Sequence, residues 1–353
     1  MAETDPAQWA HYSRVDKILH KVAFLHPGLQ RVLGSMDQDI FAPKSLPAPA
    51  GEPVFITGLP RAGTTLLLEF LAGSGDFASF TYRHMPFVLA PILWEKLTGG
   101  SRKAGEKIER SHGDGMAVDF DSPEAFEEVA WIAFHGKDYI RGDHLMPMDQ
   151  LPLDEEFSEF LTALSRRLAV TSGDRSRRYL SKNNANIGRL KTLPRIFPDA
   201  QILICLRDPV AQAASLQSQH ELFLRMHKDD AFARNYMKWI GHFDFGETFK
   251  PIRFSDPLPQ DGEFWLKYWI DAYSYARDAA GPNCHFFCYE NLREHPVETL
   301  SGLADCLSIS DKAGFIANQS QIRAPRHMPD EGPKTDLEAE ALALYEDLRQ
   351  RAL

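Results

Sequence analysis

The stretch FITGLPRAGTTLLLEF, residues 55–70, constrains the fold of this chain more than any other segment. Its apolar start predicts a buried strand, and the residues after the glycine turn predict a helix from Thr64 to about Ala72. A glycine turn between a strand and a helix exposes backbone N–H groups at the helix N-terminus, and these groups attract anions. The sequence therefore predicts an anion-binding strand–turn–helix.

The turn differs from the phosphate-binding loop of kinases and ATPases in its cations. Those loops carry a lysine just before their Ser/Thr, whereas here Gly63 precedes Thr64 and Arg61 lies two residues before Gly63. Arg61 brings a permanent planar charge, and Thr64 and Thr65 bring hydroxyl donors. We therefore expect an anion other than a triphosphate, with a glycine turn that binds nothing as the alternative.

Strand and helix patterns alternate along much of the chain. Besides the strand before Gly58, strands are expected at 178–182, at 200–207 and in CHFFCYENL from residue 284. Helices are expected after them at 185–197, 209–224 and 295–307. Alternation at this spacing is typical of a parallel sheet covered by helices on both faces. The expected fold class is an α/β fold with an open parallel sheet, a P-loop-like strand–turn–helix and mostly helical insertions.

The same pattern predicts one domain over residues 1–353. Its expected parts are a helical lead-in (1–50), an α/β core (51–80 and 178–308), two insertions (81–176 and 216–275), and a basic loop with a C-terminal helix (309–353). Within the first insertion, SPEAFEEVAWIAF predicts a helix that opens with Ser122 and Pro123, a good N-cap and first-turn pair.

Charge and hydropathy narrow the class of partner. The formal net charge of -10 argues against general affinity for nucleic acid or anionic membranes. The N-terminus has neither the basic start nor the apolar run of a signal peptide, and no apolar run approaches the roughly 18 residues of a spanning helix. The four cysteines suit reduced structural thiols. We expect a cytoplasmic protein without a membrane span, and a homo-oligomer is compatible with the sequence.

Polar side chains stand at the ends of the expected strands. Lys182 closes the second strand, Arg207 the third and Tyr289 the fourth, and Ser215 lies one to two turns into the helix after Arg207. Each taken alone has an ordinary interpretation, such as a solvated strand end or a half-buried tyrosine. Ligands of open parallel sheets bind beyond the carboxyl ends of the strands. The agreement of the four positions on one sheet edge therefore favours a binding site.

These segments resemble the sulfotransferases that use 3′-phosphoadenosine 5′-phosphosulfate (PAPS). FITGLPRAGTT resembles the family's 5′-phosphosulfate loop, and RDPVAQAAS resembles its 3′-phosphate element, in which an arginine is followed eight residues later by a serine. FPDAQILICLRDP and YENLREHPVETL also look like the core of the family. The resemblance covers most of residues 50–80 and 178–308 and implies the family's fold and its transfer of sulfuryl groups.

The resemblance also implies a role for each matching residue. The 5′-phosphosulfate would be held by Arg61, Ala62, Gly63, Thr64 and Thr65. The 3′-phosphate would be held by Arg207 and Ser215, with Tyr289 against the nucleotide. Lys182 looks like the lysine that approaches the bridging oxygen. The family often closes over the nucleotide with a late basic loop, for which QSQIRAPRHMP offers Arg323 and Arg326.

The expected mechanism is in-line and needs no metal. A phosphosulfate is shorter and less charged than a triphosphate, so Arg61, Lys182 and backbone N–H groups are sufficient to neutralise it. The core strands end in Lys182, Arg207 and Glu290. Only Glu290 is anionic, and it follows the tyrosine of the element that resembles the family, so we expect no acidic strand end of the kind that holds Mg²⁺ in P-loop enzymes.

The general base is harder to assign. Cytosolic members of the family place a histidine two residues after the lysine, where this chain has Asn184. The departure favours a base from FASFTYRHMPFVLAP, in which His84 is the best candidate near neutral pH. The rivals are Asp119, Glu124, Glu128 and His112. The spacing of the two glutamates also suits a solvated helix face.

The acceptor pocket is expected between the two insertions. The second insertion is rich in aromatic residues between 223 and 254, which suits an apolar, aromatic or sugar-faced acceptor. Such a cluster is more often the core of a helical insertion, so the acceptor is left as a small molecule, a glycan or a lipid.

Two other functions stay open. The first is an atypical P-loop kinase, which the basic strand ends disfavour. The second is a non-catalytic nucleotide-binding module of the same fold, which the presence of Arg61, Lys182, Arg207 and Ser215 disfavours.

Overall fold

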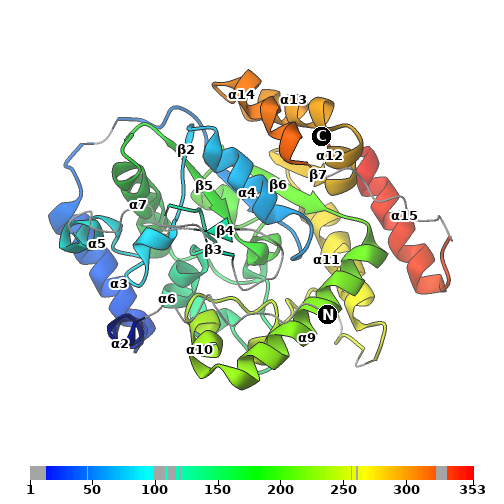
Figure 1. Cartoon of the computed structure of the whole chain (residues 1–353), viewed down its shortest axis with the longest axis horizontal. Coiled ribbons are helices and arrows are strands. Elements are labelled where there is room, and N and C mark those ends of the chain that lie inside the picture. The colour runs from blue at the N-terminus through cyan, green and yellow to red at the C-terminus, as the bar shows by residue number, and fades with distance from the viewer. Residues whose placement is uncertain are drawn as a thin grey trace.

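Five parallel strands form the central sheet. The computed structural model describes residues 13–45, 47–98, 108–109, 117–118, 121–255, 257–259, 261–322 and 332–353. The strand order is β2 (Phe77–Ala78), β5 (Arg178–Lys182), β1 (Val54–Thr57), β6 (Gln201–Leu206) and β7 (Cys284–Cys288), as Figure 1 shows. The predicted α/β fold is confirmed. The two-residue strand β2 was not predicted, because so short a segment has no recognisable period.

The register of the sheet brings the carboxyl ends of its strands to one edge. In β1, Ile56 lies opposite Lys182 of β5 and opposite Leu203 of β6. All four residues of β1 are buried, as expected for a strand with a neighbour on each side and helices on both faces. The segment that follows β1 therefore starts between the ends of β5 and β6.

Alternate residues of the strands point to opposite faces of the sheet. Val54, Ile56 and Leu203 pack with α4 (Thr64–Gly73), α13 (Pro296–Cys306) and α14 (Lys312–Ile316). Phe55 and Ile204 face the larger core. That core is covered by α6 (Glu128–Tyr139), α7 (Glu155–Thr171), α9 (Pro209–Asp229), α11 (Phe264–Ala279) and α15 (Asp336–Gln350). In Figure 1, α4 lies in front of the strands.

Shorter elements complete the described chain. They are α2 (Arg14–Ala23), α3 (Pro27–Met36), the π-helix η1 (Asp37–Phe41), η2 (Tyr82–His84), α5 (Pro91–Thr98), β3 (Ile108–Glu109), β4 (Ala117–Val118), η3 (Met148–Gln150), α10 (Ala231–Trp239), η5 (Gly246–Thr248), α12 (Tyr289–Glu294) and η6 (Ala317–Gln321). Strands β3 and β4 pair antiparallel. Among the described residues, no helix combines the length and the hydropathy needed to cross a bilayer.

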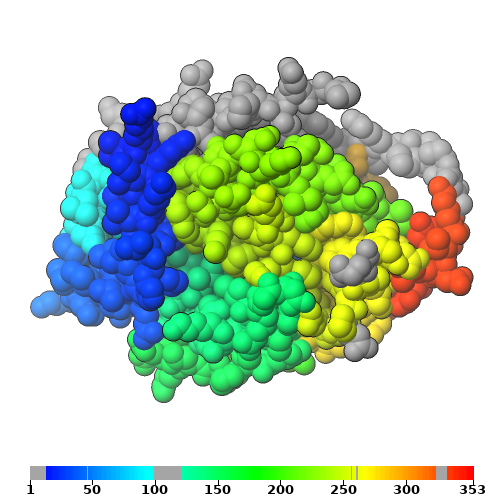
Figure 2. Space-filling view, turned by 90° about the horizontal axis from the view of Figure 1, so that it is seen from below, coloured from blue at the N-terminus to red at the C-terminus, as the bar shows by residue number. Residues whose placement is uncertain are grey.

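The N-terminal helices pack on the second insertion. Phe24 stacks on Trp239 with ring centroids 5.8 Å apart, and His20 meets the ring of Phe232 edge-on at 6.0 Å. Figure 2 shows these helices as a blue ridge beside the yellow-green residues of that insertion. The expected helical lead-in is therefore held by aromatic contacts with residues more than 200 positions later.

The helix expected from Ser122 begins later. Helix α6 starts at Glu128, and residues 121–127 before it form an irregular segment that we call the strap. The N–H of Glu124 donates to the carbonyl of Phe80 at 2.9 Å, and Pro123 forms an antiparallel bridge with Thr81. The strap therefore pairs its backbone with the segment after β2, and Ser122 is not an N-cap.

The helix expected over 185–197 is also wrong. The structure has η4 (Asn184–Gly188) and then α8 (Leu193–Ile196). Between them, the carboxylate of Asp149 accepts hydrogen bonds from the N–H groups of Lys191 at 3.0 Å and Thr192 at 2.7 Å. These bonds replace those of a continuous helix. Pro194 has no N–H to continue one.

Candidate active site

Three residues of the loop between β1 and α4 have a positive φ: Gly58 (135°), Arg61 (70°) and Gly63 (85°). At Gly58, an added Cβ would lie 2.6 Å from the carbonyl oxygen of Cys205 in β6, so only glycine fits. Arg61 is a non-glycine residue in this region, which is uncommon and concentrated at functional sites. The loop therefore has a backbone shape that its glycines make accessible.

Gly63 is the N-cap of α4 and lies against Tyr289. A Cβ at Gly63 would lie 2.9 Å from Cδ2 of that tyrosine, so the glycine leaves room for the ring. In the pattern G-x-x-x-x-G-K-[ST], the lysine directly follows the second glycine. When the pattern is aligned on Gly58 and Gly63, that position falls on Thr64. The expectation that Gly63 stands in place of the lysine is therefore corrected.

The side chain of Gln212 stabilises the loop by hydrogen bonds. The sequence patterns did not single out this residue. Its buried Nε2 donates to the carbonyls of Leu59 at 3.1 Å and Pro60 at 2.8 Å. Its Oε1 accepts from the indole N–H of Trp269 at 3.0 Å. Only the position of Gln212 on the first turns of α9, close to the strand end, could have suggested this role.

Four of the predicted residues meet on one side of the loop. Nε of Arg61 donates to Oγ of Ser215 at 3.1 Å. Nη1 of Arg207 donates to the carbonyl of Arg61 at 2.9 Å. Cζ of Arg207 lies 5.4 Å from the ring centroid of Tyr289, which begins α12 instead of ending β7 as predicted. The result is a cluster of two guanidinium groups, a hydroxyl and an aromatic ring.

Arg293 adds a third cation that was not predicted. Its Cζ lies 5.6 Å from the centroid of Tyr289. The two residues are four positions apart on α12, and this spacing places side chains on one helix face. This four-residue spacing was the sequence signal from which Arg293 could have been predicted. The cluster is therefore suited to an anionic ligand with a flat ring.

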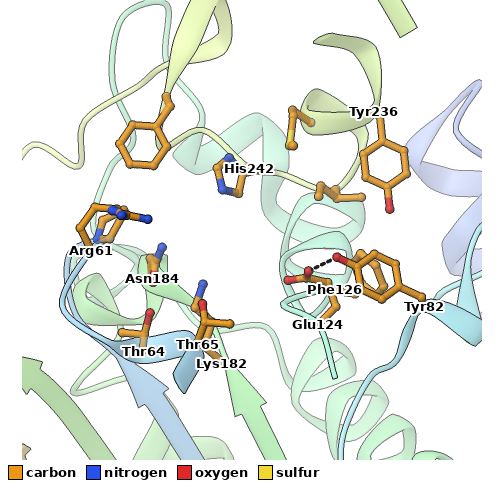
Figure 3. A pocket seen from close by; sticks show the side chains of 14 residues that line it. Arg61, Thr64, Thr65, Tyr82, Glu124, Phe126, Lys182, Asn184, Tyr236 and His242 are labelled. Carbon is orange, nitrogen blue, oxygen red and sulfur yellow. Dashed lines mark hydrogen bonds between the residues drawn. The ribbon is translucent and has the colours of Figure 1, made fainter. Parts of the chain in front are cut away.

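A pocket lies beside this cluster (Figure 3). The loop and the end of β5 supply one side of it, with Pro60, Arg61, Thr64, Thr65, Lys182 and Asn184. The opposite side comes from the two insertions, with Tyr82, Glu124, Phe126, Tyr236, Met237, Ile240, His242 and Phe245. One side is thus cationic and hydroxyl-rich, and the other is mostly apolar and aromatic. Such a pocket can hold an anionic group against an apolar molecule.

Glu124 lines this pocket, whereas Glu128 does not. Each oxygen of Glu124 accepts a hydrogen bond, Oε2 from the hydroxyl of Tyr82 and Oε1 from the N–H of Ala125 at 2.7 Å. Glu128 is buried and forms a two-bond ion pair with Arg189, with N–O distances of 2.7 and 2.9 Å. The expectation of a solvated helix face is therefore wrong for Glu128.

The carboxylates of Glu127 and Glu128 also accept hydrogen bonds from the segment after Lys182. Nδ2 of Asn183 donates to Oε2 of Glu128 at 2.7 Å. Nδ2 of Asn186 donates to Oε1 of Glu127 at 3.1 Å, and Glu127 is also fully buried. The end of β5 is thereby attached to α6. Such attachment limits the positions that the backbone of Lys182 can adopt.

The structure does not bring His84 together with Lys182. His84 lies at a separate cavity of about 400 Å³, lined also by Arg83, Thr171 and Arg177. Its Nδ1 accepts a hydrogen bond from the N–H of Thr81 at 2.9 Å. Burial lowers the pKa of His84 to about 4. A catalytic role for His84 stays a prediction, and its ring is occupied in local contacts.

Other predicted residues lie outside the described part of the chain. They are Asp119, His112, Arg323 and Arg326. Ala62 is buried within the loop. Glu290 accepts hydrogen bonds from the N–H of Asp208 at 3.2 Å and from the hydroxyl of Tyr345 at 2.9 Å, so it links β6, α12 and α15. Within the described residues, no group of three or more His, Cys, Asp or Glu side chains is arranged to hold a metal ion.

Comparison with known proteins identifies relatives of this architecture. A family model described as the sulfotransferase family matches residues 53–256. The structure of sulfotransferase STF9 from Mycobacterium avium has a TM-score of 0.53 at 14% identity, with 95% of this chain and 86% of that chain covered. Sulfotransferase STF1 from Mycobacterium tuberculosis H37Rv has a TM-score of 0.48 at 14% identity, with 95% and 88% covered. No curated protein sequence matches significantly.

Proposed function

Because this chain belongs to the sulfotransferase family, we propose that it moves the sulfuryl group of PAPS to a hydroxyl or amine of an acceptor molecule. Sulfuryl transfer is what membership of the family implies. PAPS as the donor, the residues that hold it and the course of the reaction are our proposal. We further propose that the chain acts as a single sulfotransferase-like domain.

One observation carries the choice of PAPS. Arg61, Ser215 and Arg207 are joined by hydrogen bonds of 3.1 and 2.9 Å at the edge where β1 and β6 end. PAPS differs from ATP in its 3′-phosphate and in its 5′-phosphosulfate. A guanidinium and a hydroxyl beside Tyr289 suit the 3′-phosphate and the base, and the N-terminus of α4 suits the 5′ group.

The same arrangement supplies the charge that the reaction needs. As the sulfuryl group leaves, negative charge builds on the oxygen that bridged sulfur and phosphorus. Lys182 and Arg61 line one pocket, and in this proposal they stabilise that charge together with N–H groups of the loop. We therefore propose an in-line transfer that does not depend on a metal, and we expect turnover to persist in EDTA.

The acceptor enters, in this proposal, from the side formed by the insertions. Phe126, Tyr236 and Ile240 contribute apolar surface there, close to Lys182 and Thr65. The pocket suits a small molecule with an apolar or aromatic body, and a lipid or glycan portion can extend outward. The panel of acceptors to test contains 2-naphthol, 1-octanol, a monosaccharide and an aryl amine.

Calorimetry with the product nucleotide tests the donor. We expect 3′-phosphoadenosine 5′-phosphate to bind wild type much more tightly than ATP does, and Arg207→Ala to lose at least about tenfold in affinity because a charge-assisted contact is removed. Equal affinity of the variant and wild type would show that Arg207 does not hold the 3′-phosphate.

Two other functions predict different results. A kinase of atypical sequence would turn over ATP with Mg²⁺ and ignore PAPS. A non-catalytic module would bind 3′-phosphoadenosine 5′-phosphate but would transfer sulfate to no member of the panel. A cytoplasmic location stays a prediction from the sequence.

A further inference from the structure

We propose that His242, backed by the carboxylate of Asp244, is the general base that takes the proton from the acceptor in this chain. The inference rests on the proposed sulfuryl transfer. A base must share a pocket with the groups that hold the leaving group, and it must have room to meet the acceptor. His242 lines the same pocket as Lys182, Thr64 and Thr65.

The position of His242 in the pocket is set by the fold of the second insertion. The residue lies three positions after the end of α10, and Figure 3 shows its ring across the pocket from Lys182 and Thr65. The ring stacks on Phe223, with centroids 5.8 Å apart and planes at 14°, and also contacts Phe245 at 6.0 Å. These contacts orient the imidazole at the wall of the pocket.

Asp244 connects this histidine to the strand that carries the lysine. Nε2 of His242 lies 3.5 Å from Oδ2 of Asp244, and Nδ2 of Asn184 donates to the same Oδ2 at 2.9 Å. Asn184 lies two residues after Lys182. The base and its carboxylate are therefore linked by contacts to Asn184, close in sequence to the lysine.

The charges around the imidazole suit a base. Burial lowers the pKa of His242, Asp244 and Glu124 raise it, and Lys182 lowers it. His227 of α9 is a further titratable neighbour, and its own pKa is lowered to about 4 by burial and by His242. The net effect is a lowered pKa, which favours the neutral imidazole that a base requires. The negative charge of Asp244 stabilises the imidazolium once the proton has moved.

The proposed step balances without another reactant. An oxygen of the acceptor attacks sulfur, and the new S–O bond forms as the bond from sulfur to the phosphate oxygen breaks. The proton of the acceptor hydroxyl moves to the imidazole of His242. The phosphate oxygen keeps the electron pair of the broken bond, beside Lys182. The imidazole releases its proton to water when the sulfated product leaves.

Glu124, Glu128 and His84 are the rivals from the sequence that the structure describes, and Glu128 is held in the buried ion pair with Arg189. Both oxygens of Glu124 already accept hydrogen bonds, from Tyr82 and from the N–H of Ala125. His84 lines the other cavity, whereas Lys182 lines the pocket of His242. His242 combines access to the pocket with a nearby carboxylate. It was not predicted, because IGHFDFG carries no recognisable motif.

Steady-state kinetics with PAPS and the best acceptor of the panel, beginning with 2-naphthol, tests the assignment. We expect His242→Gln to lower kcat by about 10²–10⁴. Its affinity for 3′-phosphoadenosine 5′-phosphate should stay within about twofold of wild type, because general bases act on the proton of the acceptor. The acidic limb of the pH profile should disappear in this variant. His295→Gln, which changes an exposed histidine, is the matched control and should retain both rate and profile.

Asp244→Asn tests the carboxylate separately. Removing a negative charge beside an imidazole lowers its pKa, so the acidic limb should move to lower pH while nucleotide affinity is retained. A purely structural role for Asp244 would lower the rate without moving the limb, and that result would overturn its part in the proposal.

The remaining outcomes are separable. If His242→Gln keeps the wild-type rate and limb, or if His84→Gln or Glu124→Gln loses the limb while His242→Gln keeps it, the base is assigned wrongly and sulfuryl transfer still stands. If wild type transfers sulfate to no member of the panel, the proposed function fails, and this inference fails with it.

Discussion

Nε of Arg61 donates a hydrogen bond to Oγ of Ser215 at 3.1 Å, across 154 positions of the sequence. The contact joins the glycine loop after β1 to α9 after β6. Arg61 makes this contact from a backbone with a φ of 70°, a region that non-glycine residues seldom adopt.

Replacing Lys182 should affect chemistry more than binding. We expect Lys182→Ala to lower kcat by about 10²–10³, because a preorganised charge at the leaving oxygen is lost. The affinity for 3′-phosphoadenosine 5′-phosphate should change less, since Arg207 and Ser215 are retained. Rapid-quench measurement of sulfate transfer checks this, with the exposed Lys137→Ala as control. An unchanged kcat would remove Lys182 from the mechanism.

Gly58 should tolerate no side chain. Its φ of 135° and the carbonyl of Cys205, which would lie 2.6 Å from an added Cβ, make Gly58→Ala destabilising by at least about 1–3 kcal/mol. Gly73→Ala in α4 has open space, and alanine is the better helix former by up to about 1 kcal/mol. Urea unfolding of both variants checks the contrast. Equal stability of the two would contradict the proposed strain.

Gln212 should act on the nucleotide through the loop. In Gln212→Leu, the carbonyls of Leu59 and Pro60 lose their donor, and each buried acceptor left unpaired costs about 1–3 kcal/mol. We expect a lower midpoint of unfolding and affinity for 3′-phosphoadenosine 5′-phosphate weakened by at least about tenfold. The exposed Gln217→Leu on the same helix is the control for both measurements.

Removing the charge of one partner of the Glu128–Arg189 ion pair should strongly lower the unfolding free energy. Both side chains are nearly inaccessible, with exposures of 4% and 2%. Glu128→Gln leaves a buried guanidinium without its counter-charge, and we expect a loss of about 3–5 kcal/mol in unfolding free energy. Asp347→Asn, which breaks an exposed pair with Arg351, should cost at most about 1 kcal/mol. A small effect of Glu128→Gln on the unfolding free energy would mean that the structure around Arg189 rearranges to compensate for the lost charge.

His84 should make stability depend on pH. Burial lowers its pKa from 6.5 to about 4, so between these values the unfolded chain binds more protons than the folded one. Stability is then greatest above pH 6.5 and falls as pH decreases toward 4, by about 2 kcal/mol between pH 7.5 and 5 from this residue. Urea unfolding at these two pH values should show a smaller difference for His84→Asn than for wild type. An equal difference would contradict the shift.

Much of the sheet, and the cations at the ends of its strands, could be predicted from the sequence. Strand β5 has the predicted bounds, and α4 begins at Thr64 as expected, because hydrophobic period and glycine placement are local properties. The strand ends that carry Lys182 and Arg207 follow from the same patterns. Parallel pairing brings those ends to one edge whatever the rest of the chain does.

The acceptor side could not be predicted in this way. Glu128 follows a helical pattern that suits solvent, yet it is buried against Arg189, 61 positions later. His242 has no motif, and its ring is held in the pocket by stacking on Phe223 of α9. Contacts of this kind depend on how the two insertions fold over the core.

Short local patterns of glycines, strand periods and strand ends were enough to predict a glycine loop on a parallel sheet and the cations at the edge of that sheet. Which histidine and which glutamate share a pocket with Lys182 became known only from the tertiary structure. The insertions that supply His242 and Glu124 are far apart in the chain, and long-range packing alone brings them together.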